Sequence, residues 1–134
     1  MSKVLILLVM IFLHIVDDYY LQGWLASAKQ IEWWEKNAPD KLYENDYLMA
    51  LFIHGFSWTF MTMLVPSVYV MLNTPLDRID FAPLFIIVLF SVNWIVHVIT
   101  DNSKANLKEI NLIQDQLIHI LQIVATWIVM IVMM

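Results

Sequence analysis

The stretch FAPLFIIVLFSVNWIVHVIT, residues 81–100, decides the fold class, because it contains no charged side chain. A run of about 20 apolar residues matches the ~30 Å of hydrocarbon that a transmembrane α-helix has to cross. Three further runs of this kind are predicted, at residues 4–25, 47–72 and 110–133. The sequence therefore predicts an all-α, integral membrane bundle of four transmembrane helices.

The composition of the whole chain agrees with this prediction. Of the 134 residues, 61% are hydrophobic and 14% are charged, which is too apolar for a soluble domain of this size. We therefore expect a single four-helix transmembrane domain over residues 1–134 that is surrounded by membrane lipid. Whether it forms a homo-oligomer is left open by the sequence. There is no cysteine, so thiolate ligands are excluded. The net charge of −5, with no basic patch, argues against nucleic-acid binding.

The connection between the first two spans has a pattern of its own. It reads KQIEWWEKNAPDKLYEND, residues 29–46, and places Ile31 and Trp34 on one helix face among charged side chains. This pattern predicts a short interfacial helix that ends near Pro39.

The positive residues predict the orientation of the four spans. The loops after the first and third spans carry Lys29, Lys36, Lys41, Lys104 and Lys108, whereas the opposite side carries Lys3 and Arg78. The positive-inside rule then puts the lysine-rich loops in the cytoplasm. We expect a multi-pass protein of the cytoplasmic (inner) membrane, with both termini outside.

Polar side chains on the four spans form a second pattern. Three histidine–aspartate pairs have members four residues apart, which puts both side chains on one helix face. These pairs are His14/Asp18, His97/Asp101 and Asp115/His119, and the fourth histidine is His54. At ~1.5 Å per residue, the seven groups lie within about 15 Å of the predicted cytoplasmic face, with His14 slightly deeper. The four spans are thus expected to bring them into one layer.

The first span contains a further acidic residue. Its apolar run is interrupted by His14, Asp17 and Asp18, which argues against a cleaved signal peptide, so we expect a retained helix. On an α-helix Asp17 points about 100° away from Asp18. We therefore expect Asp17 at the solvated helix end and do not count it among the candidate ligands.

Imidazole and carboxylate groups are typical metal ligands, and charged groups in lipid are costly unless they are neutralised. Asp18, Asp101 and Asp115 carry three negative charges. Two divalent ions would offset them and leave room for a hydroxide or an anionic substrate. We predict such a two-ion site, with zinc first and manganese, iron or cobalt as alternatives. The predicted ligands are His14, Asp18, His54, His97, Asp101, Asp115 and His119. The alternative is a structural network in which these groups only hydrogen-bond one another.

Other polar residues continue the same helix stripes. Gln22, Asn93 and Gln116 follow at steps of three or four residues, which suits hydrogen bonding to the ligands from outside or bonding between helices. Lys29 and Lys104 continue the stripes of the first and third spans. They are candidate anion-binding groups, and ordinary positive loop residues are the alternative.

These motifs together resemble a known family. The residues that carry the resemblance are His14-xxx-Asp18-xxx-Gln22, Lys29, His54, His97-xxx-Asp101-xx-Lys104 and Asp115-Gln116-xx-His119. In this order, over nearly the whole chain, they resemble domain-of-unknown-function family 3307, a family of small bacterial and phage membrane proteins. Asp17 and Tyr19 stand where the family pattern has Gly and Phe. The family is similar to proteins described as membrane-bound metal-dependent hydrolases, so the resemblance implies a metal site more strongly than a reaction.

Three functions follow as hypotheses. The first is a membrane-embedded, metal-dependent hydrolase of a lipid or lipid-linked substrate, phosphorylated or not. In it Asp18, Asp101 and Asp115 hold the ions and the attacking water, and Lys104 holds a phosphate together with Lys29. The second is a transporter of divalent cations or protons, and the third is a membrane interaction protein braced by its metal. An open coordination position favours the enzyme, saturated ligands favour the brace, and a water path to both sides favours transport.

Overall fold

The computed structural model describes residues 2–76 and 79–132, and every regular element among these residues is helical. The long helices are α1 (Lys3–Val16), α4 (Asp46–Asn73), α5 (Ala82–Ala105) and α6 (Leu112–Trp127). The π-helical turns η1 (Asp17–Leu21) and η4 (Ile128–Val132) extend α1 and α6. The short elements are α2 (Leu25–Ala28), α3 (Ile31–Asn37), and the 3₁₀ turns η2 (Lys41–Tyr43) and η3 (Ile79–Phe81). Arg78, which entered the orientation argument, and Met133, the predicted end of the fourth span, lie outside the described residues.

Four helical segments are long and apolar enough to cross a membrane, as the sequence predicted. They are Lys3–Leu21, Lys41–Asn73, Ile79–Ala105 and Leu112–Ile131. This confirms the all-α prediction and the number of candidate spans within the part of the chain that is described.

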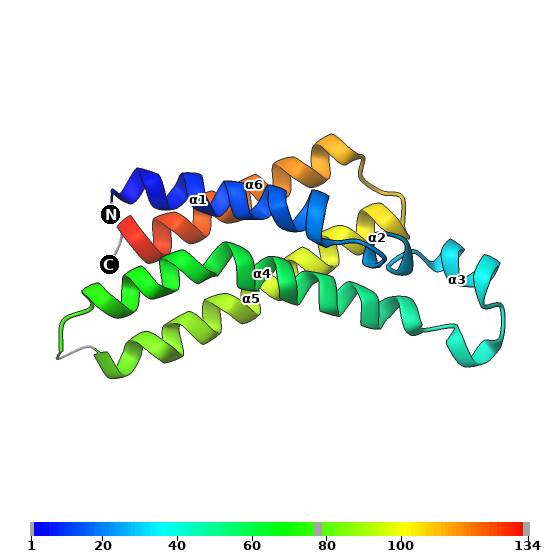
Figure 1. Ribbon diagram of the computed structural model, residues 1–134, viewed down its shortest axis with the longest axis horizontal. Helices are drawn as coiled ribbons and strands as arrows, with labels where there is room; N and C mark the ends of the chain where they lie inside the picture. The colour runs from blue at the N-terminus through cyan, green and yellow to red at the C-terminus, as the bar shows by residue number, and fades with distance from the viewer. Residues whose placement is uncertain (1, 77–78, 133–134) are drawn as a thin grey trace.

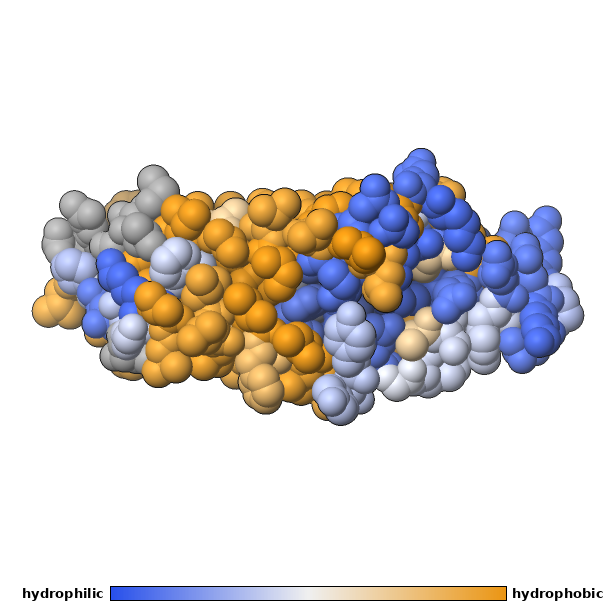
Figure 2. All heavy atoms as spheres, turned by 90° about the horizontal axis from the view of Figure 1, so that it is seen from above, coloured by the Kyte–Doolittle hydropathy of each residue, from blue (hydrophilic) through white to orange (hydrophobic). Residues whose placement is uncertain are grey.

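The four long helices pack into a bundle. α4 contacts both α1 and α5, and α6 contacts both α5 and α1, so the helices close into a ring. Figure 1 shows the two termini at one end of the bundle and α2 and α3 at the other. In Figure 2 hydrophobic side chains cover most of the terminal half of the face, with some hydrophilic ones at its outer end, and hydrophilic side chains gather in the α2–α3 half. The terminal half of the bundle is therefore mainly apolar and the α2–α3 half mainly polar on this face.

Two boundaries differ from the prediction. The first span ends at Leu21 instead of residue 25, because Gly23 adopts a positive φ of 51°, a left-handed conformation that ends helices. α3 (Ile31–Asn37) stands where the short helix ending near Pro39 was predicted, and α2 (Leu25–Ala28) is an additional short helix at the predicted end of the first span. α5 continues to Ala105 instead of residue 100, and its end is held in place by the Asn106 side chain, which donates to the Lys29 carbonyl (3.1 Å) and accepts from the Ile31 N–H (2.8 Å). These bonds tie the polar end of α5 to α2 and α3.

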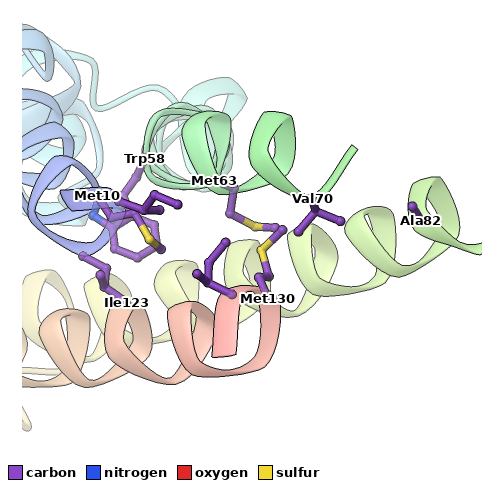
Figure 3. Packing of buried hydrophobic residues seen from close by; sticks show 9 residues of the cluster. Met10, Trp58, Met63, Val70, Ala82, Ile123 and Met130 are labelled. Atoms are coloured by element: carbon purple, nitrogen blue, oxygen red, sulfur yellow. The ribbon is translucent and has the colours of Figure 1, made fainter. Parts of the chain in front are cut away.

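The hydrophobic core fills the apolar half of the bundle. Its buried members are Ile6, Met10, Trp58, Met63, Val70, Ala82, Ile123, Met130 and Ile131. Figure 3 shows the Met63 and Met130 side chains, from α4 and η4, turned toward each other across the bundle. Trp58 is fully buried at the edge of this core and also contacts three histidines, so it separates the core from the polar residues described below.

Gly55 lets α4 and α5 approach closely. A Cβ atom at this position would lie 2.6 Å from Val98 Cγ2 and 3.1 Å from Trp94 Cδ1. Small residues permit such close approach in bundles of apolar helices, where packing provides much of the association energy. The contact also brings the neighbouring His54 ring of α4 against His97 of α5, with ring centroids 5.1 Å apart.

We expect Gly55→Ala to destabilise the protein by about 1–3 kcal/mol, because the added methyl group overlaps the rigid, β-branched Val98. Helix propensity alone gives the opposite sign, since Ala is preferred over Gly in a helix by about 1 kcal/mol. Thermal unfolding in detergent measures the difference, with Ser67→Ala on the same helix as the control for a substitution by Ala. A higher melting temperature for Gly55→Ala would contradict the close-packing explanation.

Candidate metal centre

All four long helices contribute side chains to one buried polar cluster. His14 lies on α1, Asp18 on η1, His54 on α4, His97 and Asp101 on α5, and Asp115 and His119 on α6. The side chain of Asp18 is 7% exposed and each of the other six is at most 3% exposed. The structure thus brings the seven predicted residues into the same region of the bundle, although their contacts differ.

Five of the seven form two groups that could hold a metal ion. The first group is Asp18, His54 and His97, and the second is His97, Asp101 and His119. Within each group, one possible ligand atom per residue lies within 4.8 Å of the others. Because the groups share His97, we treat these five residues as one unit and call it the central cluster.

The spacing inside the central cluster suits a small ion. His54 Nε2 lies 3.2 Å from His97 Nε2, 3.3 Å from Asp101 Oδ2 and 3.4 Å from Asp18 Oδ1. His119 Nε2 lies 3.3 Å from Asp101 Oδ1. Nitrogen and oxygen ligands at ~2.0–2.1 Å from a tetrahedral ion are about 3.3 Å from one another. These four separations therefore match the edge lengths of such a coordination shell, while His97 Nε2 and Asp101 Oδ1 are farther apart, at 3.8 Å.

Buried atoms without a hydrogen-bond partner point the same way. Among the described residues, Asp18 Oδ1, His97 Nδ1 and His119 Nδ1 of the central cluster have no such partner, but both histidines face the cluster with their Nε2 atoms. A buried polar atom without a partner carries a desolvation penalty that a metal ion or a proton can remove when the atom has a lone pair. Asp18 Oδ1, which faces His54 Nε2, is therefore the clearest free acceptor atom inside the cluster.

His14 is placed differently from the other predicted ligands. Its Nδ1 accepts a hydrogen bond from the Trp58 indole N–H (2.7 Å), so its Nε2 carries the proton and donates to Gln116 Oε1 (3.1 Å). Both ring nitrogens are thus engaged, and His14 belongs to neither metal group. Its predicted role as a ligand stays a prediction.

Lys29 and Lys104 neutralise two carboxylates of this region. Lys29 Nζ donates to Asp101 Oδ2 at 2.5 Å, and both side chains are at most 9% exposed. Lys104 Nζ donates to Asp115 Oδ2 at 2.6 Å. Asp115 Oδ1 lies 3.4 Å from His119 Nε2, so Asp115 holds a lysine and a histidine at once. Lys29 is therefore in direct contact with the central cluster, and Lys104 is in contact with Asp115 beside it.

Asp17 is a part of the site that the sequence argument placed in solvent. It is 1% exposed, its Oδ1 accepts from the Ser57 hydroxyl (2.6 Å), and its Oδ2 lies 3.7 Å from His54 Nδ1. The π-helical turn Asp17–Leu21 holds more residues per turn than an α-helix, so consecutive aspartates can both face the bundle. A carboxylate behind a ligating histidine orients the ring and raises its basicity. No sequence signal marked this turn.

Trp58 is a second residue that the sequence argument missed. Its indole ring is stacked on His97, with centroids 4.3 Å apart at 21°, and its N–H is the donor to His14. Ser57 and Trp58 follow His54 by three and four residues. The one-turn spacing that selected the aspartates would therefore have identified both residues as neighbours of His54 on its helix face.

The three amides predicted to support the ligands have separate roles. Gln116 Nε2 lies 3.2 Å from Asp18 Oδ2 and 3.1 Å from Asp115 Oδ2, so this residue contacts candidate ligands directly. Gln22 donates to the backbone carbonyl of Asp18 (3.0 Å). Asn93 Oδ1 accepts from Gln122 (2.9 Å) and Thr126 (3.0 Å), a link between α5 and α6.

Charge remains to be balanced in this region. Asp17, Asp18, Asp101 and Asp115 are four carboxylates, and Lys29 and Lys104 are two ammonium groups in contact with them. With neutral histidines, two negative charges remain uncompensated among carboxylates that are at most 7% exposed. One divalent cation offsets this excess, as would protonation of two histidines.

Comparison of the chain with known protein families, characterised proteins and solved structures found no match. The class of protein is thus defined by the fold and the site. It is an all-α bundle with four helices long and apolar enough to span a membrane, and with a buried histidine–aspartate cluster that could hold a metal ion.

Proposed function

We propose that this protein is a membrane-embedded, metal-dependent hydrolase that acts on a lipid or lipid-linked substrate. The observation that carries the proposal is that Asp18 and Asp101 belong to the buried central cluster and also line a cavity of about 340 Å³. A catalytic metal site keeps a position open to water and substrate, whereas a structural site is closed by protein ligands.

Exposed apolar side chains support insertion into a membrane. On α5, Leu84, Ile87, Val92, Ile95 and Ile99 are between 51% and 61% exposed. Soluble monomers rarely present such a continuous apolar surface. We propose a multi-pass protein of the cytoplasmic membrane, with the lysine-rich loops in the cytoplasm. We also propose membership in the family of small bacterial and phage membrane proteins that the motifs resemble.

Charge and ligand sharing bear on the number of ions. The two metal groups share His97, and one imidazole nitrogen binds one ion. A single divalent ion balances the two negative charges that Lys29 and Lys104 leave uncompensated. Two ions, as predicted from the sequence, leave an excess of positive charge that a hydroxide or an anionic substrate has to balance. Zinc, manganese, iron and cobalt all suit these nitrogen and oxygen ligands.

The residues of the site have distinct tasks in this proposal. A bound divalent ion supplies Lewis acidity and a nucleophilic water at neutral pH. His97, Asp101 and His119 form the group that would hold the ion, and His54 lies beside it, with its Nε2 3.2 Å from His97 Nε2 and 3.3 Å from Asp101 Oδ2. Asp18, which lines the cavity and lies 3.4 Å from His54 Nε2, would accept the proton of the attacking water.

Asp115 and Lys104 complete the arrangement. Asp115 holds His119 at the cluster and keeps the Lys104 ammonium group beside it. Lys104 also lines the cavity, so it can bind an anionic part of the substrate. The catalytic set of the proposal is therefore Asp18, Asp101, Asp115 and Lys104.

The interior of the bundle disfavours the transport hypothesis. Transport of a cation requires a water path from the cluster to both ends of the bundle. On one side of the cluster lies the cavity, but on the other side Trp58, Met10 and Ile123 are packed with at most 1% exposure. A brace that only holds the helices together is disfavoured because Asp18 and Asp101 reach the cavity.

The test of the proposal is metal content and hydrolysis of the purified protein and its Asp101→Asn variant. Asn is nearly isosteric but uncharged, so we expect the fold to persist while the affinity for Zn²⁺ falls by at least ~10-fold and lipid hydrolysis is lost. Asp46→Asn, at the exposed start of α4, is the matched control. Elemental analysis and assays on phospholipid and lipid-linked phosphate in nanodiscs measure both quantities.

Each other outcome selects a different function. If wild-type protein holds no more divalent metal than Asp101→Asn, the metal-centre proposal is wrong. If metal binds and no substrate is hydrolysed, while cation uptake into vesicles depends on Asp101, the protein is a transporter. If Asp101→Asn loses metal and melts at a lower temperature, while the wild-type protein shows neither hydrolysis nor cation uptake, the metal is a structural brace.

A further inference from the structure

Three lysines line the cavity that adjoins the central cluster. They are Lys29 at the end of α2, Lys104 on α5 and Lys108 in the loop before α6. Gln22, Gln30 and Gln116 line the same cavity of about 340 Å³; Gln22 and Gln30 each donate one N–H to a backbone carbonyl and keep a second, whereas Gln116 donates to two carboxylates. Cationic and neutral donors from four parts of the chain therefore surround one space beside the candidate metal centre.

The described hydrogen bonds leave donors of these lysines free. Lys29 and Lys104 each donate one N–H to a carboxylate, and Lys108 Nζ donates to the Ala105 carbonyl (2.8 Å) and forms an exposed ion pair with Glu32 Oε1 at 3.6 Å. An ammonium group has three N–H donors, so two remain on each lysine beyond these bonds. Several point-charge donors that approach from different directions suit the oxygens of a phosphate group.

We propose that this cavity binds the phosphate group of a phosphate ester, so that the substrate of the proposed hydrolase is a phosphorylated head group. A carboxylate is the competing anion, but a phosphate group carries up to two negative charges and three acceptor oxygens, so it can accept from several donors at once. The cations of the cavity are three lysines, which bind phosphate oxygens as point charges. This inference rests on the proposed function, because the phosphate has to lie beside the metal centre to be hydrolysed.

The carboxylates of the cavity make this binding depend on the metal ion. Asp18 and Asp101 line the cavity together with the lysines and repel an anion when no divalent cation offsets them. A bound ion removes this repulsion and adds a direct attraction to a phosphate oxygen. Phosphate and metal should therefore each raise the affinity of the other by the same factor.

The rim of the cavity agrees with a lipid as the source of the phosphate. Tyr19 and Leu112 line the cavity and are 58% and 55% exposed, so an apolar chain can lie against them outside it. The cavity is of a size that holds a polar head group. A free phosphate ester offers the same chemistry to the lysines, so the experiment has to compare the two sources.

The test is calorimetric titration of the zinc-loaded protein with glycerol 3-phosphate, and with phosphatidic acid in nanodiscs. We expect both to bind, with the lipid binding more tightly because its acyl chains stay on the apolar surface. Lys104→Met and Lys108→Met should each lower the affinity, Lys104→Met by about 10- to 100-fold because a charge-assisted hydrogen bond is lost. Lys41→Met, in an exposed turn away from this cavity, should leave the affinity unchanged. Metal content is measured on every sample.

The possible results separate the two proposals. If zinc binds but neither phosphate ester does, or if a chelator leaves phosphate binding unchanged, the phosphate inference is wrong while the metal centre stands. If oleate in nanodiscs binds as tightly as phosphatidic acid, the pocket is selective for charge only and the substrate class is wrong. If zinc does not bind to the wild-type protein, the proposed function fails. Should Lys104→Met fail to fold, Lys108→Met decides, because Lys108 is exposed and outside the central cluster.

Discussion

His97→Gln is expected to abolish the proposed binding of a divalent ion and, with it, the proposed hydrolysis. His97 is the one residue that both metal groups contain, and its side chain is fully buried between α4 and α6. Loss of a residue that merely supports a ligand lowers metal affinity 10- to 100-fold, so we expect loss of this shared ligand to lower it by more than about 100-fold. Titration with Zn²⁺ in the presence of a competing chelator measures the affinity.

Thr100→Val is the matched control for His97→Gln. Thr100 lies one turn further along α5, is 7% exposed, and its hydroxyl donates to the Val96 carbonyl of the same helix (2.9 Å). Val has nearly the same shape, so α5 should keep its position and the ion should remain. Zinc affinity within a factor of two or so of wild type in His97→Gln would mean that the ion is bound elsewhere.

Trp58→Ala is expected to lower the free energy of unfolding by about 3–5 kcal/mol, the range for truncation of a large buried aromatic residue. The substitution removes a side chain that is fully buried between the hydrophobic core and the central cluster. It also leaves His14 Nδ1 without its donor and His97 without its stacked neighbour. The measurement is chemical or thermal unfolding in detergent micelles.

Trp58→Phe separates the two contributions of this residue. Phe keeps an aromatic ring against His97 but cannot donate to His14, so we expect a loss of about 1–3 kcal/mol from the unsatisfied nitrogen and the smaller volume. If Trp58→Ala lowers the free energy of unfolding no more than Trp58→Phe does, the aromatic ring does not separate the hydrophobic core from the central cluster as its packing indicates.

The spans and the polar layer followed from periodicity and length. The uncharged run at residues 81–100 defined a helix because its length matches a bilayer, and the one-turn spacing of the histidines and aspartates put them on common helix faces. The structure has helices at all four predicted positions, and it brings five of the predicted ligands into two groups that could hold a metal ion. The length of the apolar runs and the spacing of residues along each helix were therefore sufficient to predict the helices and the candidate ligands.

Contacts between helices were beyond this reasoning. The sequence could not show that His14 would be engaged by Trp58 and Gln116, because the helix faces alone do not fix which side chains meet. The pairing of Lys29 with Asp101 joins residues 72 positions apart. Periodicity places each of them on a stripe, but only the packing of the helices makes them partners.

The π-helical turn Asp17–Leu21 is a position at which this chain can become one residue shorter in evolution. A π-helical turn is an α-helical turn with one residue inserted, so a chain one residue shorter here can keep the direction of α1 and the same four-helix packing. The side chain of Tyr20 is 78% exposed, so little contact would be lost with a deletion at that position. What would change is the acidity of the interior, since a regular helix turns only one of the two consecutive aspartates inward. A shorter homologue with an unaltered fold would thus carry one negative charge fewer beside His54.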